Sequence, residues 1–226
     1  MSRPAAALFF VKLPEPGRVK TRLAAAIGDD RAMRLYDAFA RDQRDALLAS
    51  GLHVIACCDP AASSRRYRTW LGQSVGYMDQ RGDDLGQRMA NAFADAFADG
   101  REAAVLTGSD APHMPSSLVA EALAQATSVG AAIAPSPDGG YSLIAFKRDA
   151  FAPEIFENMQ WSTPEVLATT LDSFAHAGRA VHLLPAVDDI DTIEDLEALV
   201  QRFANGGGPA RTLRLAAQFG IGEQVD

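Results

Sequence analysis

Apolar residues along the chain follow two alternating patterns, and together these patterns predict an α/β fold. Short apolar runs of the kind typical of buried strands span Ala6–Lys12, His53–Cys58, Val75–Asp79, Ala103–Thr107, Ala131–Ala134, Tyr141–Phe146 and Ala180–Leu184. Between these runs, apolar residues recur every three or four positions, which predicts amphipathic helices packed on a sheet. The alternation therefore favours a mostly parallel central sheet with helices on both faces.

Two regions depart from the regular alternation. Only Pro135–Gly140 separates the fifth apolar run from the sixth, which is too short for a helix and predicts either an antiparallel turn or a functional loop. A Gly-Gly-Gly-Pro stretch that begins at Gly206 ends the regular alternation. The residues from Pro209 to Phe219 are compatible with one last short helix. We therefore expect one domain over residues 1–204 and a C-terminal appendage over residues 205–226.

One helix boundary has a recognisable sequence signal. Ser162, Thr163 and Pro164 directly precede a helical stripe that begins at Val166. Ser and Thr are preferred at the N-cap, and Pro is preferred in the first turn. We therefore expect these three residues to form the cap and first turn of that helix.

The overall composition is ordinary for a soluble globular protein, yet it excludes some classes of function. The net charge of −8 argues against a general nucleic-acid binder, because such a protein presents a basic face. Cys57 and Cys58 are adjacent in an apolar run, so they build neither a disulfide framework nor a Cys-rich metal site, which fits a reducing compartment. No stretch approaches the roughly 18 apolar residues of a membrane span. We expect a cytoplasmic protein.

The most distinctive local feature is a basic loop, Pro14–Arg22, that follows the first predicted strand. It carries Gly17, Arg18, Lys20 and Arg22 against an acidic background. Cations on a short loop between a strand and a helix suit a polyphosphate. The loop has neither the Walker pattern nor the glycine pattern of dinucleotide sites. A solvated basic turn is the alternative interpretation.

Two acidic segments follow later predicted strands. Asp110 lies on a Gly/Ser turn and suits Mg²⁺ held jointly with substrate phosphates, because Mg²⁺ commonly uses one or two protein carboxylates; a turn or helix-cap role is the alternative. Asp188, Asp189 and Asp191 form the second segment. Asp191 or Thr192 is a suitable N-cap for the next helix. A second metal carboxylate fits the surplus of acids, with plain capping and solvation as the alternative.

A further loop combines an acid with two glycines. Asp138 precedes Gly139 and Gly140; paired glycines allow close approach of a ligand, and the carboxylate suits a substrate hydroxyl or amine, although a tight turn explains the same residues. We expect His113 to be a loop side chain rather than a ligand. Together, the basic loop, the acidic loops and this turn fit metal-assisted phosphate chemistry without a covalent intermediate.

The segments that carry these residues resemble a known family. They are Pro14–Leu23, Gly82–Met89, Thr107–Pro112, Pro137–Tyr141, Trp161-Ser162 and Asp189–Leu196. The set is similar to that of a bacterial family named as glycosyltransferases, with the nucleotide-diphospho-sugar transferase (glycosyltransferase-A) fold and some members named for arsenosugar biosynthesis. The resemblance covers roughly residues 5 to 200. It implies a Rossmann-like α/β/α sandwich that binds a nucleotide over the first loops together with Mg²⁺ or Mn²⁺.

The resemblance also implies roles for single residues. Those expected to hold the nucleotide phosphates are Gly17, Arg18, Lys20 and Arg22. Asp110 is expected to bind the metal, with Asp189 or Asp191 as the second ligand. Those expected to face the acceptor are Asp138, Gly139 and Gly140. The catalytic residues would be Lys20, Asp110 and Asp138.

A more distant resemblance keeps the reaction open. The first loop and Asp189–Thr192 are similar to segments of molybdenum-cofactor and phospholactate nucleotidyltransferases. Many glycosyltransferases of this fold carry Asp-x-Asp after the fourth strand, whereas this chain has Gly108-Ser109-Asp110. Three functions are compatible with the residues: glycosyl transfer from a nucleotide sugar, nucleotidyl transfer from an NTP to a phosphorylated acceptor, or nucleotide binding without catalysis. The expected partners are a nucleotide or nucleotide sugar and a small-molecule acceptor, and not nucleic acid.

Overall fold

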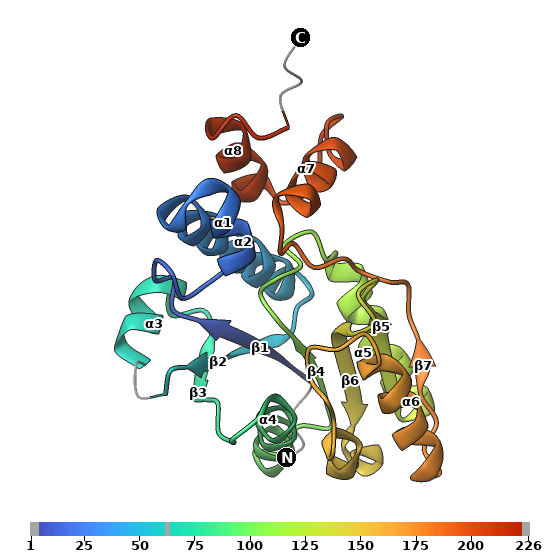
Figure 1. Ribbon diagram of the computed structural model, residues 1–226. Coiled ribbons are helices and arrows are strands. Elements are labelled where there is room, and N and C mark those ends of the chain that lie inside the picture. Colours follow the sequence, from blue (N-terminus) through green and yellow to red (C-terminus); the bar gives the residue numbers. More distant parts are fainter. Residues whose placement is uncertain (1–4, 62–63, 223–226) are drawn as a thin grey trace.

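A seven-stranded sheet forms the centre of the part of the chain that the structure describes (Figure 1). The structure is a computed structural model that describes residues 5–61 and 64–222. The strands are β1 (Ala6–Lys12), β2 (His53–Asp59), β3 (Gly76–Asp79), β4 (Ala103–Thr107), β5 (Ala131–Pro135), β6 (Tyr141–Lys147) and β7 (His182–Leu183). Across the sheet their order is β3-β2-β1-β4-β6-β5-β7.

Among the described strands, β6 alone runs against the others. β1 pairs in parallel with β2 and β4, β2 with β3, and β5 with β7. β6 pairs antiparallel with β4 and with β5. The predicted mostly parallel sheet is therefore confirmed, and the short link between β5 and β6 makes an antiparallel turn.

Helices cover both faces of the sheet, so the molecule is an α/β/α sandwich (Figure 1). They are α1 (Thr21–Ile27), α2 (Asp29–Ala49), α3 (Ser64–Leu71), α4 (Leu85–Ala98), α5 (Ser116–Val129), α6 (Val166–His176), α7 (Ile193–Arg202) and α8 (Ala210–Gln218), with two short 3₁₀ helices, η1 (Arg148–Ala150) and η2 (Pro153–Phe156). Within residues 5–61 and 64–222, every helix is too short or too polar to cross a bilayer.

The side chains of β1 show how the two faces are filled. Successive residues of a strand point to opposite sides of a sheet. Phe9 and Val11 accordingly join the cluster formed with α2, α3 and α5. Leu8 and Phe10 join the cluster formed with α4, η2 and α6. All four side chains are buried, so β1 lies at the centre of the fold and its end is held in a fixed position.

A third apolar cluster forms where α1, α2, α7 and α8 meet (Figure 1). Leu35 and Phe39 of α2 are buried in it together with Leu196 of α7 and Ala216 of α8. α8 thus lies in the segment for which the sequence suggested a short helix. A division of the chain at residue 204 stays a prediction, and its outermost residues, 1–4 and 223–226, lie outside the described residues.

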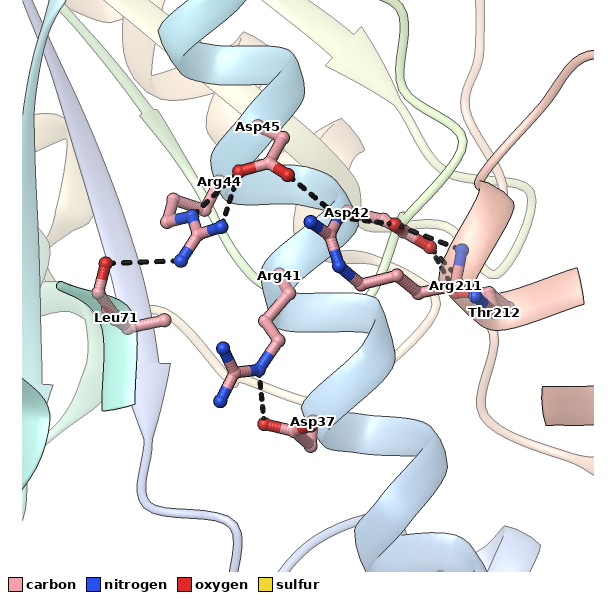
Figure 2. A network of polar contacts seen from close by, with 8 residues as sticks. All are labelled: Asp37, Arg41, Asp42, Arg44, Asp45, Leu71, Arg211 and Thr212. Atoms are coloured by element: carbon pink, nitrogen blue, oxygen red, sulfur yellow. Dashed lines mark hydrogen bonds and ion pairs between the residues drawn. The ribbon is translucent and has the colours of Figure 1, made fainter. Parts of the chain in front are cut away.

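Polar contacts fix the start of α8 to α2 (Figure 2). Asp42 is buried and accepts hydrogen bonds from the backbone N–H groups of Arg211 (3.3 Å) and Thr212 (2.8 Å). It also accepts one from the Thr212 hydroxyl at 2.9 Å and one from Arg211 Nη1 at 3.0 Å. A carboxylate in this position satisfies free N–H groups of the first turn and is favoured by the helix dipole.

The start of α7 agrees with the sequence, because Thr192 is its N-cap. The Thr192 hydroxyl accepts from the backbone N–H of Asp195 at 3.2 Å, and the Asp195 carboxylate accepts from the backbone N–H of Thr192 at 2.8 Å. This reciprocal capping box uses Thr192 and Asp195. The Asp191 carboxylate is therefore not needed for capping, and it forms an ion pair with Lys20.

The predicted cap of α6 is wrong. The helix begins at Val166 with Glu165 as its N-cap, and the described residues provide no side-chain hydrogen bond to this end. Ser162 has a positive φ of 65°, and the Thr163 hydroxyl donates to the carbonyl of Gln160 at 2.9 Å. These residues instead form a turn of their own before the helix.

Candidate active site

The loops singled out in the sequence meet at one edge of the sheet. Six strands are parallel, so their carboxyl ends lie on the same side. The order of the strands reverses between β1 and β4, since β2 follows β1 on one side and β4 lies on the other. Ligands of open α/β sheets bind beyond the carboxyl ends at such a switch point. The basic loop leaves β1 at this point, and the Asp110 turn leaves β4 beside it.

Lys20 is the centre of the site. Its Nζ lies 2.5 Å from Asp110 Oδ1 and 2.8 Å from Asp191 Oδ1, and its side chain is only 3% exposed. Nζ also lies 5.7 Å from the centre of the Phe39 ring, which forms its apolar floor. Burial alone would lower the pKa of Lys20, but attraction by Asp110 and Asp191 outweighs burial and raises it. The amine therefore stays charged and bridges the two acidic loops.

The backbone at Lys20 is strained. Its φ of 49° and ψ of 48° are left-handed, a region that residues with a side chain rarely adopt and that costs about 1 kcal/mol or more. Gly17 in the same loop also has a positive φ, of 72°, without comparable cost. The left-handed residue at position 20 starts α1 and turns the Lys20 side chain into the cluster.

The two arginines of the basic loop differ in their surroundings. Arg22 forms an ion pair with Asp191. Arg18 is 73% exposed and lies 3.7 Å from Glu15. The basic loop therefore does not act as one uniform patch, because Lys20 and Arg22 are paired with acids while Arg18 lies largely in solvent.

A buried tyrosine holds the Asp110 turn against β1. The backbone N–H of Lys12 donates to the Tyr36 hydroxyl at 2.8 Å, and the Ser109 hydroxyl lies 3.0 Å from the same oxygen. The backbone N–H of Ile190 donates to the Asp110 carbonyl at 2.8 Å. The turn after β4 is thus fixed on both sides, and it is not the cap of α5, whose N-cap is Pro115.

Asp189 lies in an excess of negative charge. Burial raises its pKa first, followed by repulsion from Asp110 and, more weakly, from Asp191 and Asp138; attraction by Lys20 opposes this, and the resulting pKa is about 7. Asp191 differs, because Lys20 and Arg22 outweigh its burial and lower its pKa. The third acid of this segment, Asp188, forms an ion pair with Arg202 and does not line the cavities at this edge of the sheet.

The turn at Asp138 has a structural reason for its first glycine. The Asp138 carboxylate accepts from the backbone N–H of Gly140 at 3.0 Å. Gly139 has a φ of +88°, and an added Cβ would overlap the backbone of Pro164. The Gly139 carbonyl accepts from the backbone N–H of Leu167 at 2.8 Å. The group that lies close to Gly139 is thus the backbone of Pro164 and not a ligand. Asp138 lies on an exposed part of the turn.

Two cavities meet at the Lys20 cluster. The smaller, of about 280 Å³, lies over the basic loop and is lined among others by Lys12, Arg18 and Tyr36. The larger, of about 700 Å³, extends over the ends of β4 and β6 toward α4 and α6. The residues that line both are Phe10, Arg22, Asp110 and Asp191. Two ligands bound in these cavities would therefore meet at Asp110 and Asp191.

Part of the larger cavity was not assigned as a site from the sequence. Leu85 and Met89 line it; their spacing predicted helix packing, and they lie in the Gly82–Met89 segment of the family resemblance, but no role in a site was given to them. Leu85 is 43% exposed, so it is not only a core residue. Trp161 and Tyr141 also line it, and they were noted only within the family resemblance. His113 lies elsewhere, against Phe203, as expected for a loop side chain.

The acids do not form a ready-made metal centre. Within the part of the chain that the structure describes, no three His, Cys, Asp or Glu side chains are gathered as ligands of one ion. The predicted ligands Asp110 and Asp191 are instead bridged by Lys20. Asp189 is the carboxylate of this group whose pKa is raised, first by burial and then by repulsion from Asp110.

The fold and the position of this site define a class: the chain has the fold of nucleotide-diphospho-sugar transferases. A crystal structure from Desulfovibrio desulfuricans G20, described as a "putative nucleotide-diphospho-sugar transferase", is 37% identical, with a TM-score of 0.90 and 97% of each chain covered. Residues 42–163, more than half of the chain, match the family described as "Uncharacterized protein conserved in bacteria (DUF2064)". The chain belongs to this family.

More distant solved structures share the fold alone. A cytidylyltransferase from Leptospira borgpetersenii serovar Hardjo-bovis is 13% identical, with a TM-score of 0.54, and 100% of this chain and 99% of that chain are covered. Rv0371C of Mycobacterium tuberculosis H37Rv, in complex with manganese, is 18% identical, with a TM-score of 0.51 and coverages of 88% and 99%. Comparison with curated proteins finds no match.

Proposed function

We propose that this protein is a metal-dependent transferase that uses a nucleotide-activated donor, with glycosyl transfer from a nucleotide sugar to a small molecule as its reaction. The observation that carries the proposal is Lys20, buried between Asp110 and Asp191 where the two cavities meet. The name of the relative from Desulfovibrio desulfuricans G20 supports the same class.

The phosphates of the donor suit the smaller cavity. Lys12, Arg18, Lys20 and Arg22 line it, against Asp110 and Asp191, so the cavity offers more cations than acids. In our assignment, the donor phosphates lie over the basic loop. Arg22 and Arg18 neutralise them, and Lys20, still charged beside its acids, faces the charge that builds on the leaving diphosphate. The expected role of Gly17 is to shape the loop.

A divalent ion fits the acidic side of the same junction. Asp110 and Asp189 are its best ligands in this proposal, because Asp191 is already paired with Lys20 and Arg22, and Mg²⁺ commonly binds one or two carboxylates and substrate phosphates. The elevated pKa of Asp189 supports this choice, since a cation would offset the repulsion. When bound, the ion would neutralise diphosphate oxygens; manganese bound to Rv0371C supports divalent metal use.

The acceptor fits the larger cavity, with Asp138 at its edge. In glycosyl transfer, the acceptor oxygen bonds to the anomeric carbon of the sugar. The bond from that carbon to the diphosphate oxygen breaks, and its electron pair leaves with the nucleoside diphosphate. The acceptor's proton passes to a carboxylate that faces this cavity, and Asp138 is exposed enough to accept it.

Nucleotidyl transfer is the second candidate. It is favoured by the single acid of Gly108-Ser109-Asp110 and by the name of the Leptospira relative. In that reaction an acceptor oxygen attacks the α-phosphorus of an NTP, and the bond to the departing pyrophosphate breaks. Lys20 and the metal would then stabilise pyrophosphate rather than a nucleoside diphosphate.

A product assay separates these functions. The protein is incubated with nucleotide sugars or with NTPs, each with Mn²⁺ or Mg²⁺ and a panel of acceptors, and nucleoside diphosphate and pyrophosphate are measured. Acceptor-dependent release of nucleoside diphosphate is expected. Acceptor-dependent pyrophosphate from NTPs would instead identify the second candidate, and metal-dependent nucleotide binding without either product would identify a binding module.

Matched variants tie the products to the site. Asp110→Asn should lower turnover about a hundredfold, since it removes a charge beside both the metal and Lys20. Asp172→Asn makes the same exchange on the exposed face of α6 and should leave turnover unchanged. Equal activity of the two variants would contradict the assigned site.

The two cysteines support a reducing compartment for this reaction. Cys57 and Cys58 are both buried and unbridged, and burial raises the pKa of both thiols. Such thiols are unreactive packing groups. We therefore extend the proposal to the cytoplasm, where nucleotide-activated donors would meet the protein.

A further inference from the structure

The two cavities that share Asp110 and Asp191 have opposite charge. The smaller cavity is lined by four cations and two carboxylates. The larger is lined by the carboxylates of Asp110, Asp138, Asp189 and Asp191. Among the described residues that line it, Arg22 is the one cation, and this guanidinium already forms an ion pair with Asp191. A ligand of the larger cavity therefore meets a negative field.

The opposite wall of the larger cavity is apolar. Leu85 and Met89 come from the first turns of α4, and Trp161 comes from the turn before α6. Gly86 explains how these elements approach each other. An added Cβ there would lie 2.9 Å from the Trp161 ring, so the indole packs directly on the first turn of α4. The wall is a preformed face suited to the apolar side of a ring or chain.

The position of the carboxylates limits what can bind beside this wall. The two that the cavities share are also those in contact with Lys20, so their charge lies where an acceptor must approach the donor. The proposed divalent ion at Asp110 and Asp189 is offset by the donor diphosphate that it binds, so an anionic acceptor would still have to lie among acids, with no free cation among the described residues of the lining. Like charge in a partly enclosed cavity lowers the local concentration of an anion.

We propose, resting on the proposed function, that the acceptor carries neither a phosphate nor a carboxylate: it is a neutral or positively charged hydroxyl compound with an apolar or ring face. The carboxylates accept hydrogen bonds from its hydroxyl groups or attract its positive charge. The apolar face lies against Trp161 and the start of α4. Nucleotidyl transfer from an NTP to a phosphorylated molecule is disfavoured by this proposal, because its acceptor would be an anion.

Binding of three small probes tests, without turnover, whether the larger cavity disfavours anions. Phenyl β-D-glucoside, phenyltrimethylammonium and phenyl phosphate share one ring and differ in charge. Their affinities are measured by the fluorescence of Trp161 in the full-length Trp70→Phe variant, because the chain has two tryptophans and Trp70 packs elsewhere, on Tyr36 and Tyr67. We expect phenyl phosphate to bind at least about tenfold more weakly than the other two.

A matched variant checks that the carboxylates cause the difference. The double variant Asp138→Asn with Asp189→Asn should bring phenyl phosphate to within about threefold of the glucoside. Asp149→Asn with Asp172→Asn, two exposed acids elsewhere, should change nothing. The difference should also shrink at about 0.5 M salt, which screens exposed charges.

Three outcomes would overturn the inference. Phenyl phosphate could bind as tightly as the other probes, the difference could persist in the acid-to-amide variant, or none of the probes could change Trp161 fluorescence. Each leaves the donor site untouched, because nucleotide binding is measured separately by thermal shift with Mn²⁺. Absence of metal-dependent nucleotide binding would instead contradict the proposed function itself.

Discussion

Two clusters of carboxylates and cations lie against α2, one over Phe39 and the other at Asp42, and they are satisfied to different degrees. Asp42 accepts hydrogen bonds from two backbone N–H groups, a hydroxyl and a guanidinium of α8 (Figure 2). The acids around Lys20 outnumber their cations, and burial together with repulsion from Asp110 raises the pKa of Asp189 to about 7.

The difference separates a structural cluster from a functional one. A buried carboxylate with all its hydrogen bonds made stabilises the fold in which it lies. A cluster with surplus charge is held in place by the rest of the fold and becomes favourable only when a ligand neutralises it. The Asp42 cluster should therefore control stability, and the Lys20 cluster should control binding.

The largest effect should come from Asp42→Ala. It leaves the buried N–H groups in the first turn of α8 without their acceptor and leaves Arg211 with Asp45 alone, so unfolding should become easier by about 3 kcal/mol, measured with urea. Activity per folded molecule should not change. Asp45→Ala removes partly exposed ion pairs with Arg211 and Arg44 and should lower stability by less than about 1 kcal/mol. Similar losses in both variants would remove the distinction.

Lys20→Ala should act mainly on binding. Loss of the charged phosphate contact should weaken nucleotide affinity or turnover by about tenfold or more, measured by calorimetry with Mn²⁺ present. Lys20→Met retains the apolar stem over Phe39 and separates charge from packing. Lys147→Ala, a surface lysine 3.8 Å from Asp149, is the control. An unchanged affinity would favour the alternative interpretation, in which the basic loop is a solvated turn.

Asp189→Asn should stabilise the protein. The folded pKa of Asp189, about 7, lies above its ordinary 3.8, so its burden on stability is absent below about pH 4, grows as the pH rises, and is complete above about pH 7. The variant should gain about 1 to 2 kcal/mol at about pH 8, after allowance for partial exposure, and nearly nothing at about pH 4. A gain that does not depend on pH would reject the cost of the buried, ionised carboxylate as its cause.

The metal connects this variant to function. If Asp189 holds a divalent ion, Mn²⁺ should raise the melting temperature of the wild-type protein more than that of Asp189→Asn. The gain in stability should then be accompanied by a loss of turnover. Equal stabilisation of both proteins by Mn²⁺ would assign the ion to other ligands.

The smallest effect should come from Arg18→Ala. Its guanidinium is 73% exposed and lies 3.7 Å from Glu15, so water screens most of its charge. Nucleotide affinity should fall only about twofold to threefold, and less at high salt. A tenfold loss would show that Arg18, rather than Lys20, carries the phosphate contact.

The sequence predicted the central strands well because burial on both sides leaves a continuous apolar signal. β1 and β4 begin and end where expected. The edge strand β7 was predicted over Ala180–Leu184 but covers only His182–Leu183, since β5 is its one partner among the described strands. The predicted cap of α6 was wrong because the backbone of Pro164 packs on Gly139, a contact between distant segments.

The site was predicted only in part for a similar reason. Parallel strands bring the loops at their carboxyl ends together, so the meeting of the basic and acidic loops follows from topology. Whether Lys20 pairs with Asp191, which lies 171 positions away, depends on a left-handed backbone that the sequence does not signal. Trp161 likewise becomes a cavity wall only through the approach of its turn to α4.

Gly139 gives the larger cavity a point at which its size can change. Any side chain at this position would displace Pro164 and, with it, the turn that presents Trp161 to the cavity. Lys20 and Asp110 lie on other loops and would keep their places. Exchanges at position 139 and in the turn before α6 are therefore a natural route by which related proteins could diversify their acceptors while conserving the reaction.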